Sequence, residues 1–170
     1  ADMSGPVVLT GVVSRTHLLY AASWLREQRR RGEEATSITV RSPHAFLGRV
    51  RVSDDDCQEI LGEVVDRPVE VHPDPLSSLG PRRGRLTLLC IGAPALRQVL
   101  PAVTTGRALP RIVVVDEGIG SYGDWATRAA AHRRAGNAPW WATIRAGAVT
   151  LGRRALTGEA WTTYERGPHG

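Results

Sequence analysis

Two adjacent acids, Asp116 and Glu117, follow an apolar run and precede a group of closely spaced glycines. A carboxylate within hydrogen-bond reach of a substrate hydroxyl can take its proton, so either acid is a candidate general base. Glycine tolerates positive φ angles and lets a ligand approach the backbone closely. The glycines here are Gly118, Gly120 and Gly123. The segment therefore combines an acid–base group with backbone that a ligand can reach.

The residues before the acids, Ile112–Val115, predict a strand that is buried on both faces. β-branched side chains without polar alternation are typical of a central strand in a parallel sheet. Open α/β sheets bind ligands beyond the carboxyl ends of their strands, which is where Asp116 and Glu117 would lie. Adjacent residues of a strand point to opposite faces, so one acid can be catalytic while the other braces the loop. An acid in this position can also do no more than cap the next helix.

A second polar cluster lies between an expected first strand, Val7–Val13, and an expected helix, Leu18–Arg30. The cluster consists of Ser14, Arg15, Thr16 and His17. The amino terminus of a helix has unpaired N–H groups and a partial positive charge, so it can receive an anion. These side chains would add donors at the same place. The alternative for His17 is an exposed histidine that only begins the helix.

The rest of the chain alternates between strand and helix patterns, which predicts an α/β fold: a Rossmann-like parallel sheet flanked by helices. Further strands are expected at Thr36–Val40, Val69–Val71 and Leu86–Ile91, and further helices at 54–65, 93–103 and 125–134. The segment 72–76 predicts a rigid turn. We expect residues 1–5 to form a disordered lead and residues 6–138 to form the Rossmann-like domain.

The last segment, 139–170, predicts an amphipathic helical tail that carries tryptophans. Trp141, Ile144, Ala148, Leu151 and Ala155 recur at helical spacing over the stretch Trp140–Tyr164. Such a helix favours packing on this domain or on a missing second domain. Contact with an anionic membrane surface is a less favoured alternative.

Composition excludes several classes of partner. The net charge is +5, but all 22 basic residues are arginine and they are spread between acids. Aromatic residues make up only 5% of the chain, so nucleic-acid binding is not expected.

The acids Asp54, Asp55 and Asp56 follow the expected N-cap Ser53, where the helix dipole favours them without a metal. Without a membrane-spanning run of roughly 20 apolar residues or a signal peptide, we expect a cytoplasmic protein.

The two cysteines predict neither a disulfide nor a metal site. Cys57 falls in an expected helix and Cys90 in an apolar strand, and two isolated cysteines are too few ligands for a structural zinc. We expect Cys90 to act as a small buried hydrophobe. No metal ligand set is predicted.

Two segments carry a resemblance to a known group of enzymes. The string Asp116-Glu-Gly-Ile-Gly-Ser-Tyr122 resembles the acid-acid-Gly motif of bacterial GT-B sialyltransferases and polysialyltransferases, notably glycosyltransferase family fifty-two and its capsular relatives. The segment Thr10–Ala21 is similar to the opening strand, polar turn and Leu-Leu helix of the same families. The two matches occur in the expected order, and the resemblance covers most of the chain as an amino-terminal GT-B half.

The resemblance implies an inverting glycosyltransferase that uses CMP-sialic acid, or a similar CMP-sugar, as donor substrate. It places the general base at Asp116, with Glu117 as the less favoured choice. It implies that the acceptor glycan is contacted by Ser14, Arg15, Thr16, His17, Gly118, Gly120, Ser121 and Tyr122. No cofactor and no metal are implied.

The chain departs from these families because the donor half, with its His-Pro motif and its Ser/Thr-rich phosphate motif, is not found after Asp116. Their His-Pro motif, which assists the departure of CMP, belongs to the second domain, whereas the one His-Pro pair here, His72-Pro73, lies before Asp116. Its role is therefore not assigned to His72. The competing hypothesis is a Rossmann-like module that binds a nucleotide or a glycan without turnover. The donor sugar, the acceptor, the linkage and the oligomeric state are not predicted by the sequence.

Overall fold

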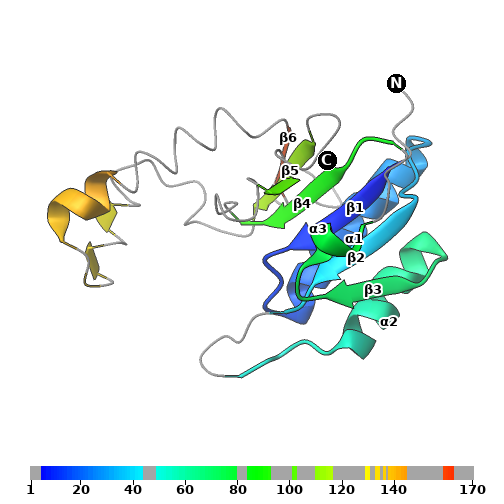
Figure 1. Cartoon of the computed structure of the whole chain (residues 1–170), viewed down its shortest axis with the longest axis horizontal. Coiled ribbons are helices and arrows are strands. Elements are labelled where there is room, and N and C mark those ends of the chain that lie inside the picture. The colour runs from blue at the N-terminus through cyan, green and yellow to red at the C-terminus, as the bar shows by residue number, and fades with distance from the viewer. Residues whose placement is uncertain are drawn as a thin grey trace.

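The computed structural model describes residues 5–43, 49–79, 84–92, 101–102, 110–116, 129–130, 133–134, 136, 138–144 and 159–162. They contain a six-stranded sheet in the order β3-β2-β1-β4-β5-β6 (Figure 1). The strands are β1 (Pro6–Thr10), β2 (Ser37–Arg41), β3 (Val69–His72), β4 (Thr87–Ile91), β5 (Arg111–Asp116) and β6 (Glu159–Thr162). All paired strands are parallel. The predicted Rossmann-like α/β fold is confirmed.

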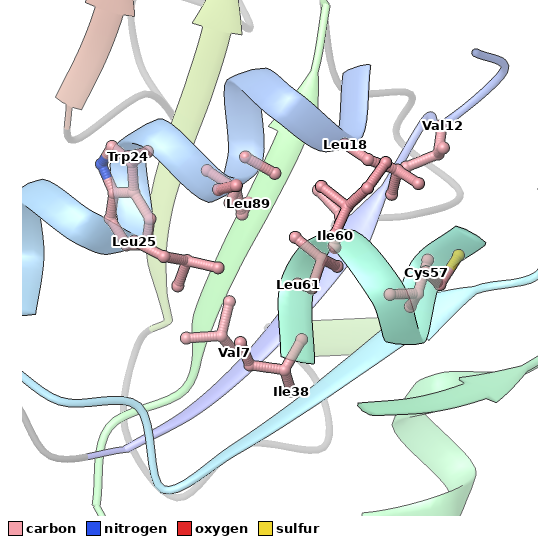
Figure 2. Close-up of a cluster of buried hydrophobic side chains, with 14 of the residues drawn as sticks. Val7, Val12, Leu18, Trp24, Leu25, Ile38, Cys57, Ile60, Leu61 and Leu89 are labelled. Atoms are coloured by element: carbon pink, nitrogen blue, oxygen red, sulfur yellow. The ribbon is translucent and has the colours of Figure 1, made fainter. Parts of the chain in front are cut away.

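Two long helices, α1 (Arg15–Arg30) and α2 (Asp54–Val65), cover one face of the sheet. Alternation along the strands decides which residues they bury: Val7 and Leu9 of β1 join the cluster beneath the helices, whereas Val8 joins the opposite face. Figure 2 shows Trp24 and Leu25 of α1 lying over the strands beside side chains of α2. The cluster explains the helical spacing of apolar residues in α1, because that stripe is the buried face.

The opposite face of the sheet has its own apolar cluster. It contains Val8, Leu86, Leu88, Cys90, Ala102, Ile112 and Val114. The short helix α3 (Pro75–Ser78) contributes Leu76 there. Pro75 at its first position fits a helix start, because that residue needs no intrahelical N–H bond. A helical turn therefore replaces part of the rigid turn predicted for residues 72–76.

A capping box begins α2. The Ser53 side chain accepts a hydrogen bond from the Asp56 amide at 3.1 Å, and the Asp56 carboxylate accepts one from the Ser53 amide at 2.8 Å. Hydrogen bonding from the Ser53 backbone, and then from its hydroxyl, lowers the pKa of Asp56. The acidic run is thus a helix start, as its position after Ser53 predicted.

The first strand is shorter than predicted and begins earlier. It ends at Thr10 rather than Val13, because Gly11 adopts a φ of +86° and turns the chain out of the sheet. Gly5 is buried and its carbonyl accepts a hydrogen bond from the Thr36 amide at 3.0 Å. The prediction of disorder is therefore wrong for Gly5, while residues 1–4 lie outside the described residues.

The helical tail predicted for 139–170 is wrong for Glu159–Thr162. Residues 139–144 are helical, but Glu159–Thr162 form β6, which pairs in parallel with β5. An edge strand presents unpaired N–H and C=O groups, and a segment containing tryptophan and threonine suits a pleated strand. Residues 145–158 and 163–170, like most of the expected helices at 93–103 and 125–134, lie outside the described residues. The division of the chain at residue 138 stays a prediction.

The helical part of the tail exposes large apolar side chains. Trp140 is 67% exposed and Ile144 is 55% exposed. The rings of Trp140 and Trp141 meet edge to face, with their centroids 5.8 Å apart. In the described part of the chain, no helix has both the length and the apolar content needed to cross a membrane.

Both cysteines are free and buried, as expected for Cys90. Burial raises the pKa of each thiol to about 11, and the carboxylates of Asp54 and Asp56 contribute for Cys57. Since the thiolate is the reactive form, we expect neither cysteine to react with Ellman's reagent at pH 8 in the native protein. Counting the protein thiols that react before and after unfolding in guanidinium tests this prediction. Rapid reaction in the native state would contradict it.

Candidate functional site

The strand order places a topological switch point between β1 and β4. From β1 the chain moves outward through β2 to β3, and from β4 it moves the other way to β5 and β6. This is the doubly wound order in which ligands bind at the carboxyl edge, where the order reverses. That edge carries Thr10 and the turn after it from β1, Ile91 from β4 and Asp116 from β5.

The turn after β1 depends on Gly11. Its φ of +86° is rarely adopted by other residues, and an added Cβ would lie 2.6 Å from the Ile91 carbonyl oxygen. The chain therefore leaves β1 in close contact with the end of β4. Ser14 then adopts an extended conformation at the N-cap of α1, and its side chain makes no capping hydrogen bond. The amino terminus of α1 thus points its backbone donors into this edge without a side-chain cap.

Replacing Gly11 with alanine tests this close approach. We expect a loss of more than about 1–3 kcal/mol in the free energy of unfolding, because the backbone strain and the contact with Ile91 act together. Gly32→Ala is the matched control: Gly32 has a φ of +77° but open space around an added Cβ. Urea denaturation followed by circular dichroism measures both variants. Equal losses would show that the contact with Ile91 contributes nothing.

His17 is buried, so the alternative of an exposed histidine is wrong. Its Nδ1 atom accepts a hydrogen bond from the Val13 amide at 3.1 Å. A ring nitrogen that accepts carries no proton, so the proton of the neutral ring lies on Nε2. The ring therefore holds the turn between β1 and α1, and the same bond fixes its tautomer.

Arg15 contacts acids of α2 rather than an open site. Its guanidinium pairs with Asp56, and Nη2 lies 3.5 Å from Glu59. The Arg15 side chain is about half exposed, so these pairs add little stability, but they tie the starts of α1 and α2 together. The neighbouring Thr16 is exposed. Of the four predicted polar residues, Ser14 and Thr16 are therefore the best candidates to donate hydrogen bonds to a ligand.

Asp116 is the last residue of β5, and its backbone lies in register with Thr162 of β6. The Gly92 amide donates to the Val115 carbonyl at 2.9 Å and so extends the pairing of β4 with β5. Only β4 separates β5 from β1, and neighbouring strands lie about 4.8 Å apart, so the ends of β1 and β5 are roughly 10 Å apart. The other predicted site residues, Glu117, Gly118, Gly120, Ser121 and Tyr122, lie outside the described residues.

Thr10 is a residue of this edge that sequence reasoning missed. It is 3% exposed, and its hydroxyl has no hydrogen-bond partner within the described residues. Its register partner on β4 is Cys90. Burial raises the pKa of the Cys90 thiol, and the Thr10 hydroxyl lowers it by a smaller amount. A thiol is only a weak hydrogen-bonding group. The signal was a hydroxyl residue at the end of an apolar strand, directly before a glycine.

No group of three or more histidine, cysteine, aspartate or glutamate side chains that could hold a metal ion occurs among the described residues. Comparison of the chain with protein-family models, with curated proteins and with solved structures finds no match. The fold and the position of the site therefore define the class: a Rossmann-like α/β domain with its polar residues at the switch-point edge.

Proposed function

We propose that this chain is the acceptor-side domain of an inverting, sialyltransferase-like glycosyltransferase. In this proposal a sugar passes from a CMP-activated donor to a hydroxyl of an acceptor glycan, and Asp116 is the general base. A second GT-B domain supplies the donor site. The proposal rests on the resemblance of the Asp116 segment to acid-acid-Gly motifs and on the position of Asp116 at the end of β5.

The observation that carries the proposal is the shared edge of β1 and β5. The sequence segments with family resemblance, around Thr10–Ala21 and Asp116–Tyr122, are about 100 residues apart in the chain. The strand order brings the end of β1 and Asp116 to one edge, roughly 10 Å apart.

The chemistry requires a base on one side of the acceptor hydroxyl. As the hydroxyl oxygen attacks the anomeric carbon from the face opposite CMP, its proton moves to the base and the bond to the CMP phosphate breaks. A carboxylate at Asp116 performs the first task. Protein hydrogen-bond donors that neutralise the departing phosphate perform the second, and the proposal assigns them to the other domain.

A non-catalytic binding module is the second candidate. The observation that favours it is that two predicted ligand-contacting side chains are engaged within the domain: Arg15 pairs with α2, and His17 Nδ1 accepts from the Val13 amide. The edge then offers backbone N–H groups and hydroxyls, which bind a ligand without turning it over. The two functions share a site and differ in whether the donor is consumed.

The test is release of CMP from CMP-sialic acid by this chain supplied with a donor-side domain, in the presence of sialylated and galactosylated acceptors. The transferase proposal expects release that depends on the acceptor. Saturation-transfer NMR measures binding of the same glycans in parallel, on the same folded sample. Glycan binding without release would support the binding module, and neither release nor binding would overturn both proposals.

A further inference from the structure

A cavity of about 200 Å³ lies at the opposite edge of the sheet from Asp116. It is bounded by the starts of β1, β4 and β5 and by the carboxyl-terminal turns of α1 and α2. Its apolar wall includes Val7, Leu25 and Val64. The proposed transferase makes no use of this place, so the cavity needs an explanation of its own.

Charged side chains of both signs line the cavity, and most of them are already paired. Arg111 lies 3.4 Å from Glu33, and Arg29 lies 3.4 Å from Glu34. The Arg29 Nη1 atom also donates to the Val64 carbonyl at 3.0 Å, which satisfies an end of α2 that has no basic residue in its last turn. These pairs form an electrically balanced rim.

Two neighbouring lining residues retain capacity for a ligand. Asp66 is exposed and forms no ion pair within the described residues. Arg67 uses Nη1 to donate to the Thr36 carbonyl at 2.9 Å, which leaves other guanidinium donors. The acid Asp66 and the base Arg67 are thus neighbours that line the cavity together with its apolar wall. Asp66 caps α2 with a φ of 52°, so its place at the helix end is set by the backbone.

The surroundings exclude several ligands. About 200 Å³ is less than the roughly 300–1,000 Å³ of pockets for drug-sized molecules, so a nucleotide is too large. Two helices end here, and their partial negative charge disfavours a phosphate, which carries no positive charge of its own to offset it. The cavity offers a sugar no aromatic face for stacking, because Trp24 is 2% exposed and the Arg111 guanidinium lies 5.5 Å from its ring centroid.

Trp24 adds an unsatisfied donor to the same wall. Its indole N–H has no hydrogen-bond partner in the described part of the chain. Figure 2 shows the indole nitrogen on the side of the ring away from the aliphatic cluster. A buried donor without a partner destabilises the protein, and an acceptor brought close by a ligand or by water removes that cost.

We propose that this cavity binds a small apolar zwitterion of the size of a free branched-chain amino acid. Its ammonium pairs with Asp66, its carboxylate with Arg67, and its hydrocarbon side chain packs against Val7, Leu25 and Val64. The site is separate from the carboxyl edge of the sheet, so it is a second ligand site of the domain. The proposal stands or falls independently of the transferase activity.

The experiment is isothermal titration of the whole chain with L-leucine, supported by thermal unfolding. Three probes dissect the ligand: 3-methylbutylamine lacks the carboxylate, 4-methylpentanoate lacks the ammonium, and glycine lacks the apolar side chain. We expect L-leucine to bind saturably and each probe to bind at least about tenfold more weakly, because each has lost one group worth about 1.4 kcal/mol or more.

Two variants identify the partners. Asp66→Asn is expected to weaken L-leucine about tenfold and to leave 4-methylpentanoate unchanged, because that probe has no ammonium. Arg67→Gln is expected to weaken L-leucine by a similar factor and to leave 3-methylbutylamine unchanged. Asparagine tolerates the left-handed conformation at position 66, so the first variant keeps the end of α2. Arg26→Gln, at an exposed position of α1 outside the cavity, is the matched control.

A third variant, Ala35→Leu, fills the cavity from its lining and is expected to abolish L-leucine binding. Absence of both heat and thermal stabilisation at millimolar L-leucine, in protein with a cooperative unfolding transition, would overturn the proposal. Equal binding of L-leucine to the wild type, Asp66→Asn and Ala35→Leu would also overturn it, since the ligand would then bind elsewhere.

Discussion

Replacing Asp116 with asparagine is expected to lower acceptor-dependent CMP release by about 10²–10⁴-fold, the usual contribution of a general base. Asparagine keeps the size of the side chain but cannot take the acceptor proton. The fall should appear in kcat with little change in KM, because the lost interaction belongs to the transition state. Initial rates at varied acceptor concentration, measured with the donor domain present, give both constants.

Two controls make this prediction specific. Asp55→Asn removes an exposed acid from the first turn of α2 and should leave the rate unchanged. Glu117→Gln should lower the rate less than Asp116→Asn if Glu117 only braces the loop. A wild-type rate for Asp116→Asn would remove Asp116 from the role of base, and a larger fall for Glu117→Gln would transfer that role to its neighbour.

Local sequence signals predicted most of the elements of the sheet. The β-branched run of β5 and the apolar run of β4 are strands, and the Ser53 capping signal begins α2. Such features depend on a few neighbouring residues, so a single sequence contains them. The parallel arrangement also followed, because strands that alternate with helices pair in that way.

Features that depend on distant contacts were missed. β6 forms because the edge of β5 offers unpaired backbone groups to a segment more than 40 residues later in the chain. The early end of β1 depends on the contact between Gly11 and the Ile91 carbonyl of β4. The pairing of Arg15 with Asp56 likewise requires α1 and α2 to meet. Helical periodicity and residue type contain no information about these partners.

The candidate site shows the same division. The expected placement of Asp116 after a buried strand is observed, since β5 ends at that residue. Its approach to the end of β1 could not be predicted without the strand order. Thr10 was missed because a hydroxyl residue within a strand looks ordinary until burial leaves it, among the described residues, with no hydrogen-bonding neighbour but the weakly bonding thiol of Cys90.

The largest effect on stability is expected for Trp24→Ala, with a loss of about 3–5 kcal/mol in the free energy of unfolding. Trp24 is among the largest fully enclosed side chains, and it packs between α1 and the strands (Figure 2). Its removal also deprives the Arg111 guanidinium of the ring 5.5 Å away. Since domains of this size are stable by only about 5–15 kcal/mol, the variant should unfold at a much lower urea concentration.

Trp24→Phe separates packing from the indole N–H. Phenylalanine keeps an aromatic ring in the core and removes a donor that has no partner in the described part of the chain. We expect it to lose less than half as much stability as alanine. Urea denaturation followed by circular dichroism compares the two variants. Similar losses for both would mean that the indole N–H has a partner whose loss matters.

A loss below about 1 kcal/mol for alanine would mean that α1 is not anchored to the sheet through Trp24. Because Arg111 begins the strand that Asp116 ends, that anchor also connects the packing of α1 to the proposed catalytic edge.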